Sequence, residues 1–203
     1  AVPHFLPETK ILRNLGMSAP APILYYGDWS GPFTPYEHQK ITASFCVMHP
    51  RAFVLNDMGT GKTASVIWAA EYLMRKEKVI KKVVILSPLS TLEPVWANEI
   101  FRINPQAKIA VVHGSRAKRL ELMAGDYDYY IVNHHGLKIV SDVVTDDMNL
   151  FIVDECTAFK NQRSELWKHL NKVLAKPTRW AWLMTGSPMA NSPIDAYALC
   201  KLV

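Results

Sequence analysis

The stretch Asn56-Asp57-Met58-Gly59-Thr60-Gly61-Lys62-Thr63 decides the fold, because it joins a glycine-containing turn to Gly-Lys-Thr. An apolar run at 52–55 precedes this stretch, and residues 64–70 have helical character. A strand, a glycine turn, Gly-Lys-Thr and a helix form the context that a phosphate-binding loop requires. The sequence therefore predicts a nucleoside triphosphate site here. The alternative is a chance Gly-Lys-Thr in a surface turn.

Each residue type in this loop has a chemical reason to be there. Gly59 and Gly61 allow the backbone to approach phosphate oxygens without a Cβ in the way. Lys62 can reach the outer phosphates as a catalytic cation, and the Thr63 hydroxyl can bind Mg²⁺. The loop amides and the positive end of the following helix face the anion. The predicted nucleotide-binding residues are Asn56, Asp57, Met58, Gly59, Thr60, Gly61, Lys62, Thr63 and Ala64.

Composition indicates a globular protein with a mild preference for polyanions. The 203 residues are 49% apolar and 20% charged, which suits one large domain or two very small ones with a buried core. A net charge of +5 weakly favours a polyanionic partner. Three widely spaced cysteines argue against a disulfide framework. We find no membrane-spanning run and no signal-peptide pattern, so we expect an intracellular protein without a membrane partner.

Strands alternate with helices along most of the chain. Apolar strands are expected at 52–55, 82–87, 109–112, 129–132, 150–153 and 179–184, and helices at 35–48, 62–77, 92–102, 116–124, 163–175 and 193–202. This alternation predicts an α/β fold, a parallel sheet with helices on both faces. In the helix at 35–48, Ile41, Phe45 and Met48 are expected on one face. Residues 1–34 are expected to form an irregular, proline-interrupted N-terminal extension, in which 23–26 is a candidate short strand.

A second chemical site follows the strand at 150–153, which ends in Asp154-Glu155. Ligands bind at the carboxyl ends of parallel strands, so this pair is expected beside the phosphate loop. Asp154 can hold Mg²⁺, and Glu155 can orient or deprotonate an attacking water. The alternative is that the two acidic residues only cap a helix.

Asp154-Glu155-Cys156-Thr157-Ala158-Phe159-Lys160-Asn161 resembles motif II of superfamily 2 helicases, in their Swi/Snf-like branch. The phosphate loop resembles motif I of that branch, which also lacks the first glycine of the usual pattern, here replaced by Asn56. Further resemblances are Pro35-Tyr36-Glu37-His38-Gln39 to the Gln motif, residues 87–92 with Trp96 to motif Ia, and residues 183–191 to motif III. They occur in order over residues 35–203.

The resemblance implies a RecA-like P-loop NTPase domain at 35–203, the helicase ATP-binding domain, which uses ATP and Mg²⁺. It implies catalytic roles for Lys62 and Glu155, metal binding by Thr63 and Asp154, and adenine recognition by Gln39. Coupling residues would be Thr157, Thr185 and Ser187, although Thr157 stands where the family usually has histidine. Contacts to the duplex DNA backbone would come from Ser87, Pro88, Leu89, Gly114 and Asn133.

The family places a second RecA-like domain downstream, with an arginine that completes the ATP site, and that domain is absent from this chain. The fragment is therefore expected to be nearly inactive alone. Three alternatives stay open at this point: a strand-separating or restriction-type helicase, a module that binds ATP and DNA without turnover, and a P-loop kinase. The kinase would need a substrate lid and more arginines around the loop.

Overall fold

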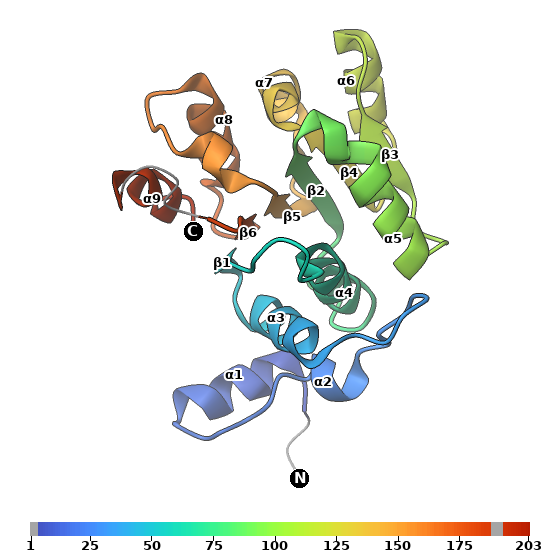
Figure 1. Ribbon diagram of the computed structural model, residues 1–203, viewed down its shortest axis with the longest axis vertical. Helices are drawn as coiled ribbons and strands as arrows, with labels where there is room; N and C mark the ends of the chain where they lie inside the picture. The colour runs from blue at the N-terminus through green and yellow to red at the C-terminus, as the bar shows by residue number, and fades with distance from the viewer. Residues whose placement is uncertain (1–3, 188–192) are drawn as a thin grey trace.

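The computed structural model describes residues 4–187 and 193–203, and its six described strands form one sheet (Figure 1). All pairings between neighbouring strands are parallel, and the spatial order is β1-β6-β5-β2-β4-β3. The predicted α/β class is confirmed. The strands are β1 Arg51–Val54, β2 Lys82–Ser87, β3 Ile109–Val112, β4 Tyr129–Asn133, β5 Met148–Val153 and β6 Trp180–Met184.

Helices cover both faces of this sheet, as predicted. One apolar core joins the first face to α3 and α4, with contributions from α1, α2 and α5. The other core joins the second face to α6, α7, α8 and α9. Figure 1 shows α1 to α4 gathered in the lower part of the view. The helices are α1 Leu6–Asn14, α2 Ile23–Tyr26, α3 Glu37–Met48, α4 Lys62–Arg75, α5 Asn98–Ile103, α6 Arg116–Ala124, α7 Leu137–Val140, α8 Glu165–Leu174 and α9 Pro193–Cys200.

The prediction of an irregular segment at 1–34 is wrong for α1 and α2. A proline in the first turn suits α1, and Leu6 is buried in the core. The candidate strand at 23–26 is one helical turn, which buries Ile23 and leaves Tyr25 exposed. The N-terminal segment therefore forms two short helices that pack onto the domain, and prolines lie in the stretch between them.

The apolar face predicted for α3 is buried only at Met48. Ile41 and Phe45 are 60% and 43% exposed, whereas Ala43, Cys46 and Val47 are fully buried. The helix packs against α4. The packed face is therefore rotated from the predicted one towards smaller side chains, which allow the two helices to approach closely.

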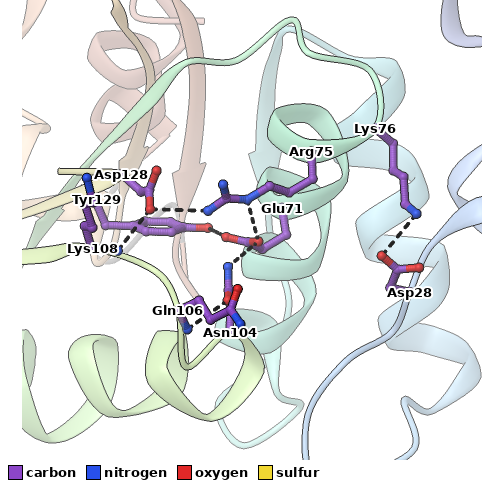
Figure 2. Close-up of polar contacts among 9 residues, drawn as sticks. All are labelled: Asp28, Glu71, Arg75, Lys76, Asn104, Gln106, Lys108, Asp128 and Tyr129. Carbon is purple, nitrogen blue, oxygen red and sulfur yellow. Dashed lines mark hydrogen bonds and ion pairs between the residues drawn. The ribbon is translucent and has the colours of Figure 1, made fainter. Parts of the chain in front are cut away.

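A polar cluster fixes the second half of α4 to the end of the sheet opposite the phosphate loop (Figure 2). The Tyr129 hydroxyl donates to one oxygen of Glu71 over 2.6 Å, and the Asn104 amide donates to the other over 2.8 Å. Arg75 pairs with Asp128 at 3.2 Å. Burial, reinforced by the Glu71 charge, raises the pKa of Tyr129 well above its ordinary value. The helix that begins at the phosphate loop is thus anchored at its far end.

We predict that Tyr129→Phe lowers the free energy of unfolding at pH 7 by about 1.5–3 kcal/mol, because it removes a buried hydrogen bond to a carboxylate. The folded protein holds the phenol proton more tightly than the unfolded chain does. The stabilisation is therefore complete below about pH 10, where free tyrosine ionises, and is lost as the pH rises further. Urea unfolding at pH 7 and pH 10.5 measures both effects.

Tyr130→Phe is the control for the charge of the acceptor, since the Tyr130 hydroxyl bonds only neutral backbone groups: it donates to Gly125 O at 2.7 Å and accepts from Tyr127 N at 3.2 Å. Each of these two neutral bonds should contribute about 0.5–1.5 kcal/mol, less than a bond to a carboxylate. Equal stability of wild type and Tyr129→Phe at pH 7 would show that the cluster does not hold α4.

Candidate functional site

The loops that follow the six strands lie along one edge, because every pairing in the sheet is parallel. The strand order places the tips of β1, β6 and β5 side by side and those of β2, β4 and β3 beyond them. The phosphate loop and the Asp154-Glu155 pair therefore share the first half of the edge. The residues expected to contact DNA share the second half.

The phosphate loop has the backbone that its glycines predict. Gly59 and Gly61 have φ of 79° and 74°, a left-handed region that favours glycine. A Cβ at Gly61 would also lie 2.1 Å from Nε2 of Gln39. The Thr60 hydroxyl donates to Asp57 O over 2.8 Å and braces the turn. Gly61 caps α4, so the first amides of that helix are directed towards the loop.

Two polar side chains fasten the loop to α3. Gln39 is buried; its Oε1 accepts from Tyr36 N at 2.9 Å, and its Nε2 donates to Thr60 O at 3.2 Å. Asn56 Nδ2 donates to the Thr42 hydroxyl over 2.9 Å. An asparagine in place of the usual first glycine thus has a structural purpose. Gln39 connects α3 to the loop, and its contact with adenine remains a prediction.

The buried ammonium of Lys62 is the feature that best fits an anion at this loop. Its Nζ is buried, and it has no hydrogen-bond partner in the described residues. A buried ammonium without a partner is costly, and a phosphate oxygen would satisfy it. Loop amides, a helix N-terminus and this ammonium together fit a nucleotide phosphate group.

Asp154 is held by two donors. The Trp96 indole donates to Oδ2 and the Glu155 amide to Oδ1, both over 3.1 Å. Burial raises the pKa of Asp154, while the Trp96 bond and the nearby Lys62 charge oppose that shift. One carboxylate with the Thr63 hydroxyl suits Mg²⁺, which keeps waters and phosphate oxygens as its other ligands. Among the described residues, no cluster of three or more His, Cys, Asp or Glu side chains offers another metal site.

Glu155 has a left-handed backbone, with φ 46° and ψ 53°. That conformation is rare for a residue with a side chain, and such strain gathers at functional sites. Glu155 precedes a short 3₁₀ turn, but its side chain makes no capping hydrogen bond, which disfavours the capping alternative. Its neighbours around an open cleft of about 380 Å³ are Asp57, Met58, Thr157, Thr185, Gly186 and Ser187.

The predicted coupling residues meet in this cleft. Thr185 N donates to Val54 O and Ser187 N donates to the Thr185 hydroxyl, both over 3.2 Å, so the tip of β6 is tied to β1. In the described part of the chain no hydrogen bond joins Thr157 to either residue. The rest of the motif III resemblance, at 188–191, lies outside the described residues.

The residues expected to bind DNA lie at the other strand tips, but not all point outward. The Ser87 hydroxyl is buried against the hydroxyl of Thr91, whereas Leu89 is exposed. Asn133 Oδ1 accepts from the guanidinium of Arg119 at 2.7 Å, and Gly114 O accepts from the same group at 2.9 Å. Sequence reasoning missed Arg119, although it lies in the short basic helix predicted there.

Sequence reasoning also missed a second contact to Asp154. His134, directly after β4, is buried, and its Nε2 donates to the backbone oxygen of Asp154 over 2.8 Å. Burial lowers the pKa of His134. Only the strand order, which brings β4 near β5 across β2, reveals the contact.

A parallel sheet with a phosphate loop after β1 and paired carboxylates after β5 defines a P-loop NTPase domain of the RecA-like type. Residues 45–203 match the family model described as SNF2-related domain. The chain therefore belongs to the SNF2-related domain family, and the predicted resemblance is confirmed.

Curated relatives and a solved structure agree with this assignment. The chain is 32% identical over 158 residues to ATP-dependent helicase FUN30 of Saccharomyces cerevisiae, covering 73% of this chain and 14% of that protein. It is 27% identical to the yeast ISWI chromatin-remodeling complex ATPase ISW1, covering 86% and 16%. The fold matches the Sulfolobus solfataricus SWI2/SNF2 ATPase core in complex with dsDNA, with TM-score 0.73, 21% identity, and coverage of 86% and 36%. The chain thus spans a small part of these relatives.

We predict that Lys62→Met stabilises the nucleotide-free protein by about 1–3 kcal/mol, because it removes a buried ammonium without a partner. The same substitution should abolish most binding of Mg-ADP, since it removes a charge-assisted contact. Urea unfolding and calorimetry measure the two effects. Lys168→Met, at an exposed lysine paired with Glu165, should change neither by much. Undiminished Mg-ADP binding by Lys62→Met would refute the phosphate site.

Proposed function

We propose that residues 35–203 are the ATP-binding motor domain of a DNA-dependent ATPase that moves on duplex DNA. The proposal is carried by one observation: in a chain of the SNF2-related family, Asp154 and Glu155 lie at the same edge of the sheet as a buried Lys62 that has no hydrogen-bond partner in the described residues. The names of the relatives, a helicase and a chromatin-remodeling ATPase, describe those proteins and support the same class of activity.

Each group of site residues has a separate role in phosphoryl transfer. Loop amides and Lys62 bind the phosphates, and Gln39 contacts the adenine edge. Thr63 and Asp154 hold Mg²⁺, which when bound neutralises phosphate charge. Glu155 faces the cleft and orients the attacking water, accepting its proton. Thr157, Thr185 and Ser187 sense the γ-phosphate side of the cleft.

DNA would bind along the tips of β2, β3 and β4. Exposed Leu89 and the loops around Gly114 and Asn133 would meet the phosphate backbone, so binding would be independent of sequence and sensitive to salt. The solved relative with the same fold is described in complex with dsDNA, which supports this choice of partner.

Efficient turnover would need a second lobe. Transition-state charge on the γ-phosphoryl group requires a further cation, commonly an arginine from another domain. After Asp154 the chain has two arginines. Arg179 is buried at the start of β6, far from the tip of that strand, where it donates to Val173 O and Thr145 O. Arg163 is exposed beyond the 3₁₀ turn. Neither is placed to act on the cleft.

None of the helices in the described residues is long and apolar enough to cross a membrane. All three cysteines are free, and two are buried. Free thiols suit a reducing compartment, so we also propose an intracellular location.

We predict that Glu155→Gln, made in the full-length protein, keeps ATP affinity and lowers the hydrolysis rate roughly a hundredfold or more, because the amide cannot accept the water's proton. Glu165→Gln, at an exposed glutamate on α8, is the control and should hydrolyse ATP like wild type. Phosphate release and nucleotide calorimetry separate the effects. Loss of affinity together with rate would assign Glu155 a structural or metal-binding role instead.

We predict that residues 1–203 alone hydrolyse ATP poorly even with saturating duplex DNA, and that the full-length protein is strongly stimulated by DNA. The reason is the missing arginine, worth a factor of about 10³–10⁵ in related NTPases. Phosphate release is compared at low salt, with and without duplex. Robust DNA-stimulated turnover by 1–203 would overturn the two-lobe proposal, and a full-length protein that binds ATP and DNA but stays silent would favour a binding module.

A further inference from the structure

Asp154 receives side-chain hydrogen bonds from two elements that follow other strands. Trp96 donates to its carboxylate oxygen Oδ2 over 3.1 Å, and His134 donates to its backbone oxygen over 2.8 Å. The Trp96 and His134 bonds are not local, since each donor comes from a separate strand-loop unit.

Both donors belong to elements that begin at the proposed DNA surface. Trp96 lies in the turn Leu92–Ala97, which continues from the loop after β2 that holds Pro88 and Leu89. His134 follows Asn133 directly, at the tip of β4. Each donor to Asp154 is thus close in sequence to a proposed DNA contact: Trp96 follows Leu89 by one short turn, and His134 follows Asn133 directly.

Two segments next to these hydrogen bonds have an unusual backbone. The turn Leu92–Ala97 is π-helical, a rare geometry that often marks functional sites and differs from an α-helix by one residue of register. Glu155, next to Asp154, is held in a left-handed conformation that the surroundings must maintain. The His134 ring also packs edge-on against Phe159, at the end of the 3₁₀ turn that follows Glu155.

Burial makes both hydrogen bonds costly to break. Trp96 is fully buried and His134 nearly so, and neither polar group can exchange its partner for water at small cost. A small shift of either donor therefore requires Asp154 to follow or to lose a buried hydrogen bond. The carboxylate is the proposed Mg²⁺ ligand, and the backbone leads into the proposed catalytic Glu155.

We propose that Trp96 and His134 are positioning residues that couple DNA binding at the tips of β2 and β4 to the placement of Asp154 and Glu155. The inference rests on the proposed function and extends it, because it names the contacts that connect the two halves of the sheet edge. Neither residue touches nucleotide or DNA in this scheme. Each acts through Asp154.

The test measures coupling between two ligands in the full-length protein. The affinity for a non-hydrolysable Mg-ATP analogue is measured with and without duplex DNA, and the ratio of the two constants is the coupling factor. For a coupled motor we expect about fivefold or more in wild type. Trp96→Phe and His134→Leu should bring the factor close to one, with the separate affinity for DNA within about twofold of wild type.

Matched variants separate positioning from general damage. Trp182→Phe removes another fully buried indole bond, from Nε1 to His49 O at 3.1 Å, away from Asp154, and should keep the wild-type factor. His134→Gln retains an N–H donor and should restore part of the coupling that His134→Leu loses. DNA-stimulated hydrolysis should follow the same order, with kcat falling and the KM for ATP in the presence of DNA rising as the coupling factor is lost.

The outcomes distinguish the two proposals. If wild type is coupled and Trp96→Phe and His134→Leu are coupled equally well, this inference is wrong while the proposed function stands. If Trp182→Phe loses coupling as fully as Trp96→Phe does, the effect is general destabilisation and the inference is again overturned. A wild-type protein whose nucleotide affinity does not change with DNA would overturn this inference, and one whose ATP hydrolysis also does not respond to DNA would overturn the proposed function as well.

Discussion

Because every strand pairing is parallel, the polar loops of this domain have one edge on which to meet. A hydrophobic sheet with buried residues on both faces leaves its chemistry to the strand tips. The strand order then assigns the tips to two halves, the phosphate loop and carboxylates on one side and the loops after β2, β4 and β3 on the other. Asp154 lies where the halves join, since β5 neighbours β2.

The site contains buried charges and a strained backbone, which lower the stability of the fold and must be offset by contacts elsewhere. Among the described residues Lys62 Nζ is buried without a hydrogen-bond partner, Asp154 is desolvated, and Glu155 has a left-handed backbone. The anchor at the far end of α4, where Tyr129 and Asn104 hold Glu71, lies at the opposite end of the strands. The stabilising contacts and the strained site residues are thus separated along the strands.

Much of this architecture was predictable from the sequence, because strong local signals agreed with the global fold. The six strands follow apolar runs, and Gly59, Gly61 and Lys62 stand where a phosphate loop needs them. The parts that were missed depend on tertiary contacts. The buried face of α3 is rotated away from Ile41 and Phe45 because Ala43 and Cys46 pack where α3 meets α4.

Within the site, two buried polar residues also have roles that depend on tertiary contacts and could not be predicted from the local sequence. In the sequence Arg119 cannot be distinguished from other charges on a basic helix, whereas in the fold it is buried where Val112 O, Gly114 O and Asn133 Oδ1 accept its hydrogen bonds. His134 was similar to an ordinary loop histidine, and its role arises from the proximity of β4 to β5. In neither case does a local pattern predict the partner.

Hydrogen–deuterium exchange on residues 1–203, with and without Mg-ADP, tests most directly the claim that this edge is a nucleotide site. We expect slower exchange of the amides at 57–64 and 154–157, because phosphates would order the loop and Mg²⁺ would order the Asp154 segment. Exchange near Glu71 and Tyr129 should change little. Saturating Mg-ADP that leaves 57–64 unprotected, or that protects the opposite end of the sheet instead, would contradict the nucleotide site.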